Sequence, residues 1–312
     1  MSQPSCSLAT GSDNGGEADV AIKRYLYDHE LERLRTEAGF LVDTVLAAKG
    51  ELFLALRRDY GPDIGYVNIY SRGNSLAKVV FQKRGGYGVE ISCEFFGADE
   101  ATRIKRLAKF LPDLRRHNKG ANRYLWTVDA KQLHTLLQRA NISTLMHGIR
   151  HRDFTEELWF EQTLVADNLG RDDFIIIDRQ VDEPDDDRGR LDLLALQRVA
   201  EGRYQFVPLE VKLGNNVELA HDVRDQVNRY VERIEERFDD YRTCYELVYA
   251  QLRSLGLISA GPEKVQIVRG TEGMVIVGGY AGLAREAIAE LHEHAPDIRV
   301  KQFINSIDRA TD

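Results

Sequence analysis

The sequence predicts an α/β protein, α+β overall, in which a mixed sheet flanked by helices follows a smaller α+β domain. Two observations predict this class. Segments with helical apolar spacing alternate with strand-like segments along the second half of the chain. In the first half, strand-like runs are joined by glycine-rich connections that suit hairpins. With 312 residues, 43% of them hydrophobic, the chain can bury the core of one large domain or two ordinary ones.

The first half is expected to hold a tail and an accessory domain. Residues 1–19 are small and polar, which is typical of a disordered tail. From about Val20 to Gly50 the apolar spacing is helical and ends at a glycine cap. Three strand-like runs and two helical stretches follow, at 51–59, 64–73, 76–96, 99–116 and 129–140. We therefore expect an α+β domain over 20–150 that serves substrate grip, oligomerisation or regulation.

The second half is expected to form its own domain over 151–312. Asp153, with Glu156 three residues later, is similar to a capping box, and the helix should run to about Leu169. After it we predict a strand at 173–181, an acidic turn at 182–189 and two strands within 190–214. A long broken helix follows at 218–255, then strands at 264–268 and 273–280, a helix at 284–294 and a closing strand at 298–304.

Composition narrows the class of protein. The net charge of -8 disfavours a protein coated in nucleic acid but leaves a local basic patch open. Three cysteines lie far apart, without the spacing of a disulfide framework or a cysteine zinc site. No apolar run reaches the ~18–20 residues that span a bilayer. We expect a cytoplasmic protein with no membrane partner.

Three charges stand inside two runs that otherwise look like buried strands. Asp192 lies in "RLDLLALQ", and Glu210 and Lys212 lie in "FVPLEVKLG". Strand alternation puts Glu210 and Lys212 on one face, away from Val207, Leu209 and Val211. A hairpin turning near Glu201 and Gly202 would bring Asp192 opposite or diagonal to Glu210, at a Cβ separation of ~5–8 Å.

Two acids this close repel each other and require a compensating positive charge. Lys212 supplies one charge, and a divalent cation with oxygen ligands would supply more. Such an ion activates water and stabilises charge on a phosphate, while the lysine positions the water. The alternative is a structural salt bridge of Lys212 with Asp192 or Glu210 on an exposed sheet face.

The motif order resembles the PD-(D/E)XK nuclease superfamily. Its helix glutamate, aspartate, E-x-K and Q-x-x-x-Y elements match "EELWFEQTL", "GRLDLLAL", "LEVK" and "QVNRY". The last element is typical of RecB-type members. The sequence around these motifs is also similar to that of NucS-like endonucleases and Shedu-type antiviral nucleases. No proline precedes Asp192, where Leu191 stands. The resemblance covers about 150–255 and does not reach 1–150.

The resemblance implies a restriction-endonuclease-like fold and a set of site residues. Asp192, Glu210, the carbonyl of Val211 and a helix glutamate would hold Mg²⁺ or Mn²⁺. Glu157 fits the motif register, whereas Glu161 is the more embedded alternative one turn later. Gln226 and Tyr230 would support water and substrate, and Lys212 would position the attacking water.

A basic segment lies outside this motif. The segment 101–125 contains eight lysines and arginines but only one acidic residue, Asp113. Such an excess of positive charge is what a phosphate-contacting patch needs. The expected nucleic-acid contacts are Arg103, Lys105, Arg106, Lys109, Arg115, Arg116, Lys119 and Arg123, with Arg190 nearer the motif. The alternative is a solvated helix face.

The sequence therefore predicts a metal-dependent nuclease that acts on DNA rather than RNA, with genome maintenance or phage defence implied by the resemblance alone. One rival is a nuclease-fold module that binds nucleic acid or assembles without turnover. A homo-oligomer is compatible with either. The other rival is a structural salt-bridge cluster in an ordinary α/β protein.

Overall fold

The computed structural model describes residues 22–59, 62–97, 99–110, 116–119, 122–151, 155–181 and 189–304, with backbone only for 109–110 and 116–119. The expected tail at 1–19, Asp153, Arg115 and the acidic turn up to residue 188 lie outside these ranges. Within them, no helix is both long enough and apolar enough to cross a membrane.

The first half forms an antiparallel sheet in the order β1-β2-β3-β4-β6-β5. Arg72 and Gly73 both have positive φ in the tight turn between β2 and β3, and Gly85 and Gly86 do the same between β3 and β4. The hairpins expected from these glycines are confirmed. The strands are β1 (Leu52–Asp59), β2 (Ile64–Ser71), β3 (Asn74–Phe81), β4 (Tyr87–Ser92), β5 (Arg116–Lys119) and β6 (Arg123–Val128).

The helices of the first half depart from the sequence prediction in two places. The helical pattern before Gly50 is two helices that break at Glu37 and Ala38. The helix expected over 99–116 is described over Glu100–Phe110, and Arg116 lies in a strand instead. The helices are α1 (Asp28–Thr36), α2 (Gly39–Ala47), the 3-10 turn η1 (Cys93–Phe96), α3 (Glu100–Phe110), α4 (Ala130–Leu136) and α5 (Arg139–Arg150).

The second half forms a mixed sheet flanked by helices, as predicted. Its strand order is β12-β11-β9-β8-β7, with β10 pairing with β9. β8 runs antiparallel to β7 and β9, whereas β10 and β11 are parallel to β9 and β12 is parallel to β11. The strands are β7 (Phe174–Val181), β8 (Leu191–Ala200), β9 (Arg203–Leu213), β10 (Gln266–Ile267), β11 (Met274–Gly278) and β12 (Arg299–Phe303).

Helices cover both faces of this second sheet. The long helical segment is broken at Arg237, as expected. The first helix of this half begins at Glu156 with Thr155 as its N-cap, so Glu156 is the first residue of the helix and not the third, as the predicted capping box requires. The helices are α6 (Glu156–Asp167), the 3-10 turn η2 (Val217–Leu219), α7 (Asp222–Glu236), α8 (Phe238–Ser254) and α9 (Ala281–His294).

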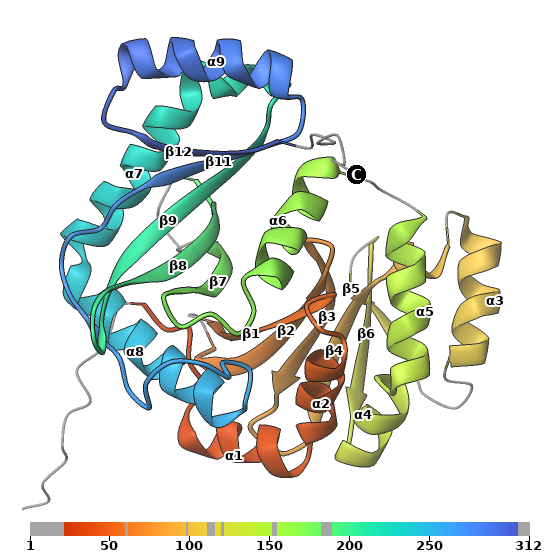
Figure 1. The fold of residues 1–312 in the computed structure, drawn as a ribbon. Helices are drawn as coiled ribbons and strands as arrows, with labels where there is room; N and C mark the ends of the chain where they lie inside the picture. The colour runs from red at the N-terminus through yellow and green to blue at the C-terminus, as the bar shows by residue number, and fades with distance from the viewer. Residues whose placement is uncertain are drawn as a thin grey trace, which may run out of the picture.

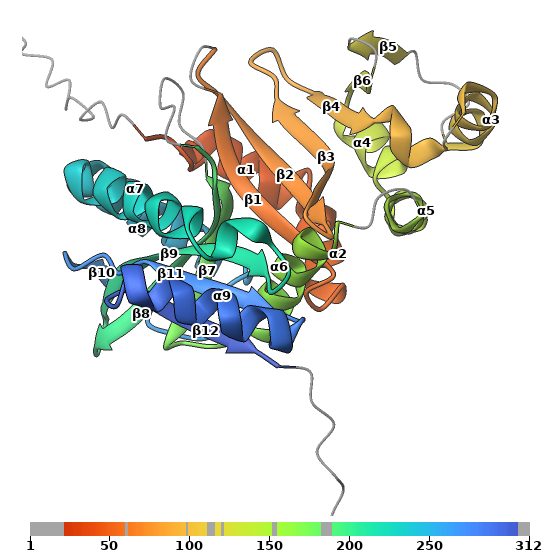
Figure 2. The same ribbon diagram turned by 90° about the horizontal axis from the view of Figure 1, so that it is seen from above.

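α6 lies between the two sheets (Figures 1 and 2). Its Leu164 and Val165 pack against Leu209 of β9, and Phe53 of β1 joins the same cluster from the other side. The opposite face of β8 and β9 packs on α7 and α8. Strand side chains that point away from α6 are therefore buried as well, which the sequence analysis did not expect for the face that carries Glu210 and Lys212.

Candidate active site

Asp192 and Glu210 meet where β8 and β9 begin to diverge. The register from Leu193↔Leu209 to Gln197↔Gln205 is the one predicted from a turn at Glu201 and Gly202. The backbone pairing of β8 with β9 ends at Leu193. At the next residue, Oδ2 of Asp192 accepts a hydrogen bond from the backbone N–H of Val211 at 2.9 Å. Asp192 thereby fixes the start of the divergent segment.

Lys212 lies between two carboxylates. Its Nζ is 2.9 Å from Oε1 of Glu210 and 2.7 Å from Oε2 of Glu218, a residue of η2. Burial alone would lower the pKa of Lys212, but Glu210 and Glu218 outweigh it and raise that pKa above the ordinary lysine value. Lys212 is therefore a permanent cation that donates hydrogen bonds, and it is not a proton acceptor.

The surroundings of Glu210 disfavour the charged form of its carboxyl group. The residue is 5% exposed, and among the described residues its Oε2 is buried without a hydrogen-bond partner. Burial, followed by repulsion from Asp192, raises the pKa of Glu210 to about 8 even though Lys212 opposes the shift. A buried carboxylate in this state gains from any further positive charge that reaches it.

Asp192 shows the same tendency in a more accessible position. Burial raises the pKa of Asp192, while the Val211 N–H bond and the charges of Lys212 and Arg190 oppose that rise. Asp192 and Glu210 therefore compete for the positive charge of one lysine. The structural salt bridge considered as an alternative is present between Glu210 and Lys212, but it is buried rather than exposed, and it leaves one carboxylate oxygen orphaned.

The two candidate glutamates of α6 have different surroundings. Glu161 is 2% exposed, and its Oε2 lies 2.7 Å from a guanidinium nitrogen of Arg179, a fully buried residue of β7. Burial is the main cause that raises the pKa of Glu161 to about 7, and Arg179 opposes it. The positively charged partner of Glu161 is thus a residue of the protein itself, Arg179.

Glu157 faces the charged cluster more directly. Burial raises the pKa of Glu157, with Lys212 opposing and Asp192 adding to the shift, and a hydrogen bond from Asn216 lowers it. The side chain is only partly buried. Glu157 thus remains the α6 carboxylate with access to an added cation, in line with the preference that the motif register gave it.

Gln226 and Tyr230 lie one turn apart on α7, as expected, but they make different contacts. The Tyr230 hydroxyl donates to the carbonyl oxygen of Arg190 at 2.9 Å, so the tyrosine holds the start of β8 in place. Gln226 hydrogen-bonds to Glu218, and within the described residues its buried Oε1 has no partner. The amide is therefore the α7 group with spare hydrogen-bonding capacity beside the cluster.

The residues before β8 are held by α7 as well. Arg233 donates to the carbonyl of Gly189 at 3.1 Å, and Gly189 has φ +89°, in the region that favours glycine. Arg190 follows with an exposed side chain, and its charge acts to lower the pKa of Asp192. The structure thus brings one predicted phosphate contact, Arg190, to the cluster.

The basic segment at 101–125 is not brought to the cluster. α3 lies at the opposite side of the molecule from the second sheet in both views (Figures 1 and 2). Lys105 and Arg106 are exposed on α3, Arg103 donates to the carbonyl of Gly97 at 2.7 Å, and Arg123 pairs with Glu90 at 3.9 Å. The remaining members, whose side chains or whole residues lie outside the description, are Lys109, Arg115, Arg116 and Lys119.

The donor atoms of the cluster suit a hard divalent cation. Carboxylates of Asp192, Glu210 and Glu157, with the Val211 carbonyl, are oxygen ligands of the kind that Mg²⁺ and Mn²⁺ take, and the orphaned Glu210 oxygen is ready to be paired. These carboxylates are not gathered into a finished ligand set. In the described part of the chain, the side-chain group whose ligand atoms all lie within 4.8 Å is a different one, His221, Glu290 and His294.

Sequence reasoning missed three residues that shape the cluster. Glu218 reaches Lys212 through η2, Arg179 neutralises Glu161, and Asn216 bonds both Glu157 and the N–H of Glu218. The sequence signal available for this region was Asn216 itself, which follows Gly214 and Asn215 in a turn. Asparagine directly before a short helix is a typical N-cap.

No protein-family model, no curated protein and no solved structure matches this chain.

Proposed function

We propose that the chain is a divalent-metal-dependent nuclease of the PD-(D/E)XK type, which hydrolyses phosphodiester bonds in DNA at the Asp192–Glu210–Lys212 cluster. The observation that carries this proposal is the buried Glu210, whose Oε2 lacks a partner although Lys212 and Asp192 are beside it. A carboxylate kept in this state costs stability, and a cation removes that cost.

The residues that would hold Mg²⁺ or Mn²⁺ are Asp192, Glu210, Glu157 and the carbonyl of Val211. When bound, the ion supplies Lewis-acid stabilisation of charge on the phosphate and makes a water molecule more acidic. Asp192 has a second task in this arrangement, because its bond to the Val211 N–H positions the β9 backbone that would present the Val211 carbonyl.

Lys212 orients the attacking water and stabilises negative charge on the phosphate, because its raised pKa keeps it protonated. In hydrolysis the water oxygen forms a bond to phosphorus, a phosphorus–oxygen ester bond breaks, and the leaving oxygen takes up a proton. The proton lost by the water passes to bulk solvent, and solvent also protonates the leaving oxygen, so that Glu157 stays available to hold the ion.

Lys212→Ala should abolish cleavage, because it removes the cation that orients the water. The assay follows nicking of supercoiled plasmid and cutting of single-stranded DNA with Mg²⁺, with Mn²⁺ and with EDTA. Asp192→Asn, which preserves an acceptor for the Val211 N–H, should lose activity by more than about tenfold, since loss of even an outer-sphere partner of a metal costs about 10–100-fold. Lys131→Ala, an exposed lysine of α4, is the matched control and should cut like wild type.

Equal nicking by wild type, Lys212→Ala and Asp192→Asn would trace the activity to a contaminant and reject the proposal. A folded wild-type protein that cuts neither DNA form with either metal would reject it too.

A second candidate function is a nuclease-fold module that binds nucleic acid without turnover. One observation favours it: Lys212 already has two carboxylate partners, Glu210 and Glu218, which compete with water for its three N–H groups. This candidate predicts DNA binding that is insensitive to Mg²⁺ and to Lys212→Ala, with no cleavage.

A further inference from the structure

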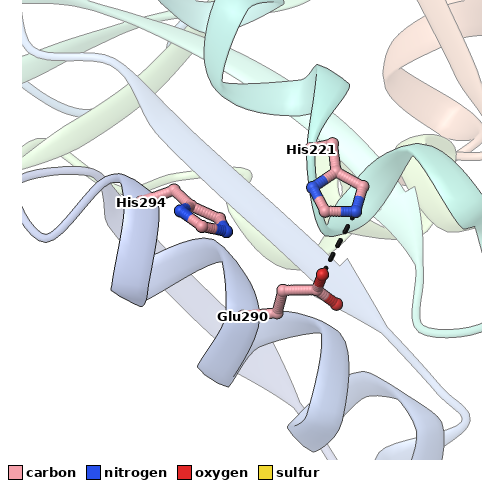
Figure 3. A group of neighbouring side chains, drawn as sticks. All are labelled: His221, Glu290 and His294. Carbon is pink, nitrogen blue, oxygen red and sulfur yellow. Dashed lines mark ion pairs between the residues drawn. The ribbon is translucent and has the colours of Figure 1, made fainter.

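Two imidazoles and a carboxylate from distant parts of the sequence meet on the surface of the second half. Glu290 and His294 lie four residues apart on α9, a spacing that puts them on the same face of the helix. His221 immediately precedes α7, and its ring lies beside both (Figure 3). One ligand atom from each of the three lies within 4.8 Å of the other two.

The contacts within this group already approach the geometry of a shared ion. His221 Nε2 is 3.1 Å from Glu290 Oε1, and the two imidazole ring centroids are 6.2 Å apart. Two ligands of a tetrahedral zinc ion, each about 2.0–2.2 Å from the metal, are about 3.4 Å apart. The first pair thus needs almost no movement, and the remaining adjustment is a rotation of the exposed His294 side chain.

The three side chains stand on a rigid base. Leu291 and Ala295, the neighbours of Glu290 and His294 in sequence, are buried with Leu219 and Val223 in one hydrophobic cluster. The backbone N–H of His221 donates to the carbonyl of Glu218 at 3.3 Å, so η2 fixes its position. The backbones that carry the ligands are therefore held in place before any ion arrives.

The donor atoms select the class of cation. Imidazole nitrogens suit Zn²⁺, Cu²⁺ and Ni²⁺, whereas Mg²⁺ and Ca²⁺ prefer oxygen alone. A cation also gains from the carbonyl end of α9, where His294 is the last helical residue. Three protein ligands leave one position open to solvent, so the ion would exchange more readily than one in a closed four-ligand site.

We propose that His221, Glu290 and His294 bind a transition-metal ion of the zinc class, which fastens the C-terminal end of α9 to the start of α7. This site is separate from the Asp192–Glu210–Lys212 cluster in ligands and in metal preference, and it does not depend on nuclease activity. The two sites share η2, because that turn carries Glu218 and also positions His221.

The test is zinc binding by the untagged full-length protein, measured by calorimetry after removal of metals with a chelator. Asp192→Asn serves as the background, so that the carboxylate cluster does not dominate the signal. His294→Ala and His221→Ala should each weaken zinc binding by more than about tenfold, since loss of even an outer-sphere partner costs about 10–100-fold. His292→Ala is the matched control, exposed on the same helix but outside the group, and it should bind zinc unchanged.

Equal affinities for the two ligand variants and His292→Ala would assign the zinc to adventitious surface sites and overturn the proposal, as would the absence of zinc uptake. Cobalt gives an independent readout. Co²⁺ bound by these nitrogen and oxygen ligands should absorb in the visible range, and this absorption should be lost in His294→Ala and kept in His292→Ala. All three side chains are exposed, so the substitutions leave the fold intact.

Discussion

Single residues determine the chemistry of the candidate active site, and Glu210 is the residue with the least favourable environment. It shares Lys212 with Glu218, faces Asp192, and keeps an oxygen without a partner in the described structure. Its relation to Asp192 follows from local rules, namely strand alternation and a turn at Gly202. Its environment follows from α7 and η2, which come later in the chain.

The raised pKa of Glu210 predicts a pH-dependent loss of stability in the metal-free protein. The pKa is about 8 in the folded protein and 4.5 in the reference state, so the folded state holds a proton that the unfolded chain has released. The stability linked to that proton is present below about pH 4.5 and is lost as the pH rises through about 8. Glu210→Gln removes this titration.

In EDTA, the unfolding free energy of Glu210→Gln relative to wild type should therefore rise by about 1 kcal/mol or more between pH 5 and pH 8. Urea denaturation at a series of pH values measures it. A difference that stays constant over this range would show that the pKa of Glu210 is ordinary.

What the sequence could predict at this scale depended on whether regular strands and one tight turn connect the residues. Asp192, Glu210 and Lys212 lie on adjacent strands, so periodicity and one turn were enough to relate them. Glu218 bonds Lys212 only because η2 folds back over β9, and His221 meets Glu290 across about 70 residues. No local pattern encodes the approach of His221 to Glu290.

Helices and strands in this fold approach one another closely where glycine allows it. Gly148 lies within α5, and a Cβ at this position would stand 1.9 Å from the carbonyl oxygen of Phe95 in η1. Gly282 lies in α9, and a Cβ there would meet nothing within 4 Å. Helix propensity alone predicts that alanine is better than glycine at both positions, by about 0.5–1 kcal/mol.

The packing predicts opposite outcomes for the two substitutions. Gly148→Ala should destabilise the protein by about 1–3 kcal/mol, because the backbone of η1 must move away from α5. Gly282→Ala should stabilise it by a few tenths to about 1 kcal/mol. Thermal or urea unfolding of both variants measures the contrast. If both substitutions stabilise the protein, the close contact of α5 with η1 is not present.

The element scale also shows why some boundaries were missed. The helix predicted over 99–116 does not reach Arg116, which belongs to β5, and β5 and β6 lie in a segment that was dominated by its charges. By contrast, β7, β8, β9 and α6 have strong period-two or helical patterns and appear where they were expected.

Across the whole molecule, the two halves share buried contacts. The largest hydrophobic core takes side chains from Ile22 in the first half through Ile267 in the second. Asp178 of β7 lies at this junction, 1% exposed, with Arg24 at 3.2 Å, Arg57 at 2.6 Å and the Tyr245 hydroxyl at 2.9 Å. The division expected near residue 150 stays a prediction, and any two domains would unfold together.

Asp178→Asn should therefore destabilise the whole chain by about 3–5 kcal/mol, because it leaves two buried arginines without their shared counter-charge. Asp173→Asn is the matched control. It removes a carboxylate paired at 2.7 Å with Arg171 at the surface and should cost less than about 1 kcal/mol. Urea unfolding followed by fluorescence and by circular dichroism should give one coincident transition for wild type. Two separate transitions would show that the halves fold independently.

We propose that Asp192 and Glu210 share a divalent cation, and Mn²⁺ anomalous diffraction from a soaked crystal tests this most directly. We predict an anomalous peak within about 2–2.6 Å of carboxylate oxygens of both residues, with Lys212 released from Glu210. The peak should be lost in Asp192→Asn. A Mn²⁺-soaked crystal with no peak at these carboxylates, or with manganese only at His221, Glu290 and His294, would contradict the claim.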